Sequence, residues 1–111
     1  MHDPELIKIR LLKESDIAAA MELKEFAGWN QTESDWRLLL KLEPEGCFAA
    51  VLDDQVVGTT TTTRYGRELA WIGMVLVRPE HRRSGIATKL MKTALDYLKP
   101  KVETVKLDAT P

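Results

Sequence analysis

The chain has 111 residues, of which 44% are hydrophobic and 30% are charged, as expected for one soluble globular domain with a modest core. Its formal net charge of −1 argues against a general binder of nucleic acids or membrane surfaces. No apolar run approaches the roughly 20 residues that cross a bilayer, and the first residues lack a signal-peptide pattern, so we expect a cytoplasmic protein.

The first third of the chain predicts a strand followed by two helices. Alternating apolar residues predict a half-buried strand over 6–13. Ser15 then has the side chain of a good N-cap, and helical spacing of apolar residues predicts a helix over 16–26. Thr32 and Asp35 have the spacing of a capping box, which places the start of a second helix there.

Three strands are predicted next, over residues 46–53, 55–65 and 68–77. Short turns separate them, so each should lie antiparallel to the one before it. The second contains five threonines in a row, 59–63, for which a solvated strand face is favoured over a hydroxyl-lined pocket. The third is the most apolar segment of the chain and predicts a central strand covered on both faces.

The remaining segment predicts a helix and one more strand. An apolar stripe at helical spacing begins near Gly85, Pro100 ends it, and a strand over 102–109 follows. A helical crossover between two strands of one sheet predicts that they run parallel, with a right-handed connection. The order β-α-α-β-β-β-α-β therefore predicts a single α/β domain over 1–111, with a mixed sheet (α+β) and helices on both faces.

The turn before the last helix is the strongest candidate for a functional site. It matches the pattern Arg/Gln-x-x-Gly-x-Gly/Ala and lies between an apolar strand and a helix. Glycine allows close backbone approach, and the unpaired N–H groups of a helix start converge on an anion. Between Arg78 and Lys92 there are five basic residues, Lys89 among them, and one acid, a local charge of +4. This pattern favours one small polyanion over an extended phosphate backbone.

The stretch from Val75 to Met91 resembles the acetyl-CoA motif of the GNAT family of N-acetyltransferases, and the order of elements agrees over essentially the whole chain. The resemblance implies acetyl transfer from acetyl-CoA to a primary amine of a small molecule or peptide, with no metal. It places the pantetheine arm along the end of the fourth strand and the pyrophosphate on the following turn. The implied cofactor-binding residues are Val75, Leu76, Val77, Arg82, Arg83, Ser84, Gly85, Ile86, Ala87 and Thr88.

The catalytic residues stay unassigned. Many family members carry a general-base carboxylate in the fourth strand, where this chain has Trp71; Glu68 lies nearer the strand start and is favoured as a surface carboxylate. His81 is favoured as a solvated loop histidine, and Cys47 as a buried strand thiol. The family also bends this strand with a bulge, which Gly73 would ease, although a packing glycine is an equal alternative.

The family's fold continues with a helix and two strands, which often carry a tyrosine that protonates the CoA thiolate. The present sequence stops at Pro111, and neither Tyr65 nor Tyr97 is at that place. We therefore expect either a C-terminally incomplete fragment or a homodimer that shares strands at an exposed sheet edge. The alternative to an active enzyme is a CoA-binding or assembly module without turnover.

Overall fold

The computed structural model describes residues 7–26, 28, 32–81 and 85–107. Its helices and strands follow the predicted order. They are β1 (Lys8–Leu11), α1 (Ile17–Phe26), α2 (Glu33–Leu42), β2 (Cys47–Leu52), β3 (Gln55–Tyr65), β4 (Leu69–Val77), α3 (Ile86–Leu98) and β5 (Thr104–Leu107). Two short 3₁₀ helices, η2 (Glu14–Asp16) and η3 (Pro79–His81), precede α1 and α3.

The described strands form one sheet in the order β1-β2-β3-β4-β5. The first four are antiparallel neighbours, and β5 lies parallel to β4, with Ile72 opposite Leu107. The mixed sheet and the parallel crossover are therefore as predicted. β4 is an interior strand, paired with β3 and β5 and packed against helices on both faces, as predicted, while the middle one of the five described strands is β3.

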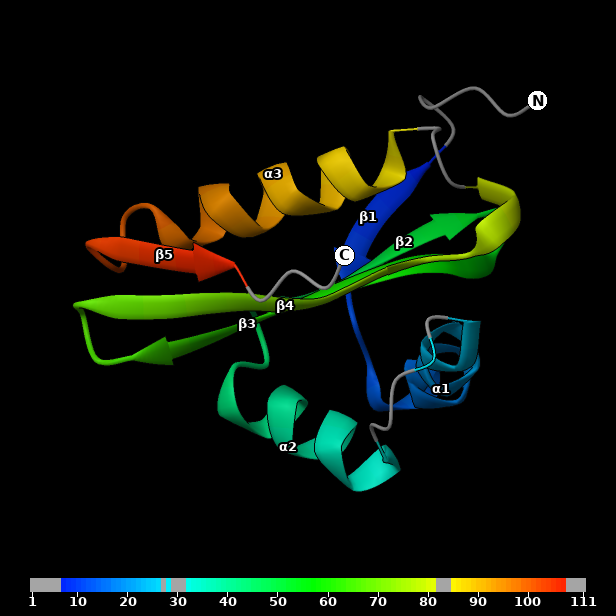
Figure 1. Ribbon diagram of the computed structural model, residues 1–111, viewed down its shortest axis with the longest axis horizontal. Helices are drawn as coiled ribbons and strands as arrows, with labels where there is room; N and C mark the ends of the chain where they lie inside the picture. The colour runs from blue at the N-terminus through cyan, green and yellow to red at the C-terminus, as the bar shows by residue number, and fades with distance from the viewer. Residues whose placement is uncertain (1–6, 27, 29–31, 82–84, 108–111) are drawn as a thin grey trace.

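Helices cover both faces of the sheet, with α3 on one side and α1 and α2 on the other (Figure 1). The predicted stripe of α3 is confirmed, since Ile86, Leu90, Ala94 and Leu98 are all buried. Glycine at position 58 lets α3 approach closely. A Cβ there would lie 3.0 Å from both Ile86 Cγ2 and Leu90 Cδ1.

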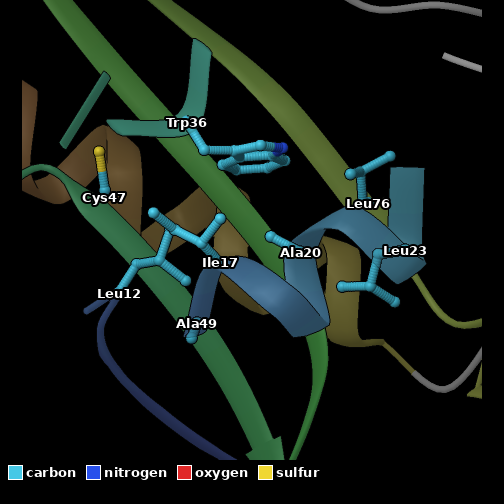
Figure 2. Packing of buried hydrophobic residues seen from close by; sticks show 8 residues of the cluster. All are labelled: Leu12, Ile17, Ala20, Leu23, Trp36, Cys47, Ala49 and Leu76. Carbon is cyan, nitrogen blue, oxygen red and sulfur yellow. The ribbon is translucent and has the colours of Figure 1, made fainter. Parts of the chain in front are cut away.

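The opposite face is filled by an apolar cluster centred on the fully buried Trp36 of α2 (Figure 2). The indole packs in one cluster with Ala20 and Leu23 of α1 and Leu76 of β4. This cluster joins both N-terminal helices to β4. The buried members are Leu12, Ile17, Ala20, Leu23, Trp36, Cys47, Ala49 and Leu76.

The start of the first helical region differs from the prediction. Ser15 is exposed within η2, and Asp16 takes the capping role: its carboxylate accepts the backbone N–H of Lys13 at 2.8 Å. The same carboxylate accepts two hydrogen bonds from Arg10 of β1, at 2.6 and 2.9 Å. The Arg10 hydrogen bond lowers the pKa of Asp16. The Asp16 carboxylate ties the turn to β1 through two charge-assisted hydrogen bonds, which are stronger than those that a neutral serine hydroxyl would accept.

The second helix begins as predicted. The hydroxyl of Thr32 accepts the Asp35 N–H at 3.2 Å, and the Asp35 carboxylate accepts the Thr32 N–H at 2.8 Å. Both donors belong to the unpaired first turn of a helix, so this reciprocal pair satisfies them locally.

Candidate functional site

The fourth strand carries a bulge opposite the threonine run of β3. Thr59 lies opposite Leu76 and Thr61 opposite Gly73, so β4 has one residue more than β3 between the two pairs. Met74, at the bulge, has φ +51°, a left-handed conformation that non-glycine residues seldom adopt. The expected bulge is therefore present. Its left-handed residue is Met74, directly after Gly73.

The bulge changes which face each β4 residue occupies. Before it, Ile72 packs against α3; after it, Val75 does so, while Met74 and Leu76 pack on the side of α1. β5 pairs with β4 only as far as Ile72. Past that point the described residues leave the outer edge of β4 without a strand partner. Such an edge accepts an extended ligand as an added strand.

Four of the five threonines in the 59–63 run are buried and Thr63 is half-buried, contrary to the predicted solvated face. Thr59, Thr60 and Thr62 are 0% exposed and Thr61 is 2% exposed. The reason is the position of β3, which is the central strand and is covered by helices on both faces. Each of these four hydroxyls donates to a backbone carbonyl, as buried polar groups must. Thr62, for example, donates to the Gly46 carbonyl at 2.8 Å.

A cavity of about 360 Å³ opens beside the bulge, on the face of the sheet that carries α2. No charged residue is among those described as lining it. They are Leu39, Thr61, Thr63, Tyr65, Trp71, Gly73 and Met74. The hydroxyl-lined pocket, the less favoured alternative for the threonines, is thus partly correct. The period-two spacing of positions 61, 63 and 65 was the available signal that these side chains share one face.

At the helix-opening turn, Arg82, Arg83 and Ser84 lie outside the described residues. Gly85 is exposed, has φ +84° and forms the N-cap of α3. A Cβ there would meet nothing within 4 Å, so glycine is favoured by the left-handed backbone and not by crowding. The side chain of Ile86 is 1% exposed and belongs to the core, which leaves only its backbone for a ligand. Ala87 and Thr88 are exposed.

Two of the basic residues counted near this turn are engaged within the protein. Arg78 donates to Glu22 of α1 at 2.8 Å and to Glu80 at 2.9 Å. The hydrogen bond to Glu80, followed by the one to Glu22, raises the pKa of Arg78. The ammonium of Lys89 donates to the Ile7 carbonyl at 2.7 Å. The local charge of +4 is therefore reduced by Glu22, which is distant in the sequence and was not counted.

The other candidate residues do not enter the cavity. Glu68 is exposed and precedes Gly73 by five residues, about 16 Å along an extended strand. His81 is half-buried in η3, not fully solvated. Cys47 is buried as predicted, and burial raises the pKa of its thiol to about 11, which disfavours a reactive thiolate. Within the described residues, no group of three His, Cys, Asp or Glu side chains could hold a metal ion.

A comparison with protein families matches residues 15–111 to the acetyltransferase (GNAT) family. The chain belongs to the GNAT family. This assignment supports acetyl transfer with an acyl-CoA donor as the general activity of the domain. No curated protein matches the chain. Among the helices that the structure describes, none is long and apolar enough to span a membrane.

Solved structures share the fold of this GNAT chain. A putative acetyltransferase from Pyrococcus horikoshii is 27% identical, with a TM-score of 0.86; the match covers 96% of this chain and 39% of that one. Ard1 from Thermoplasma volcanium is 23% identical, with a TM-score of 0.86, and coverage is 92% and 70%. A NatC complex bound to Gag peptide and CoA is 24% identical, with a TM-score of 0.78, and coverage is 91% and 72%.

Proposed function

We propose that this GNAT domain transfers an acetyl group from acetyl-CoA to a primary amine of a small molecule or peptide. The observation that carries the proposal is the bulged end of β4, whose outer edge lacks a strand partner past Ile72 among the described residues. The next elements in the chain are η3 and the glycine turn that opens α3. An edge for the pantetheine amides and a helix start for the pyrophosphate are thus adjacent.

The proposed donor site uses mainly backbone groups. Val75, Leu76 and Val77 would pair with the pantetheine arm along the β4 edge. The turn would hold the pyrophosphate, with Arg82 and Arg83 adding charge-assisted contacts. The open space around Gly85 fits this role, because a ligand can approach the backbone there without displacing a side chain. The remaining members of the proposed set are Ser84, Gly85, Ile86, Ala87 and Thr88.

We infer that the acceptor amine enters the cavity beside the bulge. This cavity and the β4 edge share Gly73 and Met74, so a donor and an acceptor bound there would meet at the bulge. The described lining is uncharged and includes the aromatic residues Tyr65 and Trp71. Such a lining favours an amine with an apolar or aromatic substituent over one that carries further charges.

The test combines acetyl-CoA titration by calorimetry with a thiol-release assay over a panel of amines. We expect acetyl-CoA to bind with a sub-millimolar Kd. We expect CoA release with an arylalkylamine or with a peptide whose first residue is apolar. Release with a polyamine or an acidic amino acid should be weaker. Preference for the charged amines would contradict the acceptor assignment, and absence of acetyl-CoA binding would contradict the whole proposal.

A CoA-binding module without turnover is the second candidate function. It is favoured by the absence of a carboxylate among the described residues that line the cavity. Binding of acetyl-CoA without CoA release on any amine would support it. The homodimer and the cytoplasmic location also stay predictions; the half-exposed Leu107 on the outermost described strand is consistent with a further contact at that edge.

A further inference from the structure

Two threonines of β3 donate their hydroxyl hydrogens to the backbone of the β4 bulge. Thr59 Oγ1 donates to the Met74 carbonyl at 2.8 Å, and Thr61 Oγ1 donates to the Gly73 carbonyl at 3.2 Å. Thr60 adds a longer contact of 3.4 Å to the Gly73 carbonyl. The register between the strands shifts at this point, so side-chain hydroxyls act where the regular ladder is interrupted.

These hydrogen bonds also determine where the neighbouring N–H groups point. In a trans peptide unit the carbonyl oxygen and the following N–H lie on opposite sides of the chain. Because the carbonyls of Gly73 and Met74 are held toward β3, the N–H groups of Met74 and Val75 are turned away from β3. They face the outer edge of β4, which has no strand partner past Ile72 among the described residues.

The bulge needs such support. Met74 has φ +51°, a conformation that persists in non-glycine residues only when the surroundings hold it. Thr59 and Thr61 are 0% and 2% exposed, so water cannot easily take over their hydrogen bonds. The buried hydroxyls of Thr59 and Thr61 therefore help to hold the left-handed backbone of Met74 in place.

We propose that Thr59 and Thr61 are positioning residues that aim the Met74 and Val75 N–H groups at the thioester oxygen of the acyl donor. This inference rests on the proposed function. The amine nitrogen attacks the carbonyl carbon, a C–N bond forms and the carbonyl electron pair moves to oxygen, where two N–H donors stabilise the oxyanion. Collapse breaks the C–S bond and releases CoA as a thiolate, while the nitrogen loses one proton to water and the thiolate gains one from water.

The test uses Thr59→Val and Thr61→Val, which keep the branched shape and remove the hydroxyl. Thr62→Val is the matched control, because Thr62 is equally buried but donates to the Gly46 carbonyl, away from the bulge. We expect the two bulge variants to lose about tenfold or more in kcat, with the Kd for acetyl-CoA nearly unchanged. Thr59→Ser, which retains the hydroxyl, should restore most of the rate. If Thr59→Val fails to fold, Thr61→Val carries the test.

A second readout does not depend on turnover. In NMR titrations with acetyl-CoA, the amide signals of Met74 and Val75 should shift in the wild type and in Thr62→Val, and shift much less in Thr59→Val. A donor that binds without moving these amides would overturn the inference and leave the proposed function standing. Equal loss of kcat in Thr62→Val and Thr59→Val would also overturn it. A wild type that does not bind acetyl-CoA would overturn both proposals.

Discussion

Gly85 has a conformational role that can be separated from its proposed contact with the donor. Its φ is +84° and a Cβ would meet nothing within 4 Å. Gly66, in the turn between β3 and β4, has the same two properties, with φ +69° and open space around it. The two glycines are therefore matched in backbone strain and crowding, and differ in their position relative to the proposed pyrophosphate site.

Replacing either glycine by tryptophan should have a similar effect on stability. A left-handed conformation costs a non-glycine residue about 1–2 kcal/mol, so Gly85→Trp and Gly66→Trp should lower the unfolding free energy comparably. Only Gly85→Trp should abolish acetyl-CoA binding, because the indole would occupy the turn that the pyrophosphate needs. Urea unfolding measures the unfolding free energy of each variant, and calorimetric titration of the folded protein measures its binding of acetyl-CoA. Unchanged binding by Gly85→Trp would show that the pyrophosphate binds elsewhere.

At the scale of elements, Glu43 connects three parts of the fold. It follows α2, and its side chain is 5% exposed. Its carboxylate accepts Arg64 Nε of β3 at 2.8 Å and the hydroxyl of Tyr97 of α3 at 2.5 Å. Burial, followed by the hydrogen bond to Glu43, raises the pKa of the Tyr97 phenol to about 12. The buried Glu43 carboxylate thus stabilises the neutral, protonated form of the Tyr97 phenol.

Removing the Tyr97 hydroxyl should destabilise the fold. Tyr97→Phe should lose about 1.5–3 kcal/mol of unfolding free energy near pH 7, because Glu43 loses one of its donors. Urea unfolding measures the change, and Tyr65→Phe, at an exposed tyrosine, is the control. An unfolding free energy equal to that of the wild type would contradict the stabilising role of this hydrogen bond.

The same contact predicts a pH dependence. The pKa of a tyrosine is near 10 in the unfolded chain and about 12 for Tyr97 in the folded protein. The neutral Tyr97 phenol therefore contributes fully to the unfolding free energy below about pH 10. The unfolding free energy of the wild type should therefore decrease as the pH rises from about 10 to about 12, because the phenol ionises more easily in the unfolded chain. In Tyr97→Phe, this part of the decrease should be missing.

For the molecule as a whole, the proposed acetyl transfer requires the acceptor amine to lose a proton. The described residues lining the cavity include no carboxylate, and Trp71 stands where the family resemblance places one. Under the proposed function, we therefore expect the acceptor amine to bind in its neutral form or to lose its proton to water. The supply of neutral amine then controls the rate at pH 7.

The pH dependence of kcat/KM should follow the acceptor. With two amines whose pKa values differ by about two units, the inflection of the profile should move by a similar amount, because free substrate ionisation appears in kcat/KM. The measurement is initial CoA release at subsaturating amine across pH 6–10. An inflection at the same pH with both amines would indicate a protein base instead.

Local features of the fold were predictable from the sequence. The Thr32–Asp35 capping box and the apolar stripe of α3 depend on residues within one or two turns, and both are present as expected. The left-handed conformation of Gly85 at the start of α3 is also a local property, because glycine adopts a positive φ without steric cost. Periodicity and turn residues therefore determined the order of elements and the antiparallel hairpins, and the motif around Gly85 identified the family.

Contacts between distant segments were decided only by the tertiary structure. Asp16 replaces Ser15 as the cap because Arg10 of β1 reaches it, and Arg78 is engaged by Glu22, 56 residues away in the chain. Thr59 to Thr62 are buried because β3 is the middle strand of the sheet and helices cover both its faces, and the strand register sets two of their hydroxyls against the bulge carbonyls. The sequence by itself thus determined the elements and the donor motif. The left-handed conformation of Met74 at the bulge, the cavity and the pairing of charges were decided by packing, because they depend on which residues meet across strands and helices.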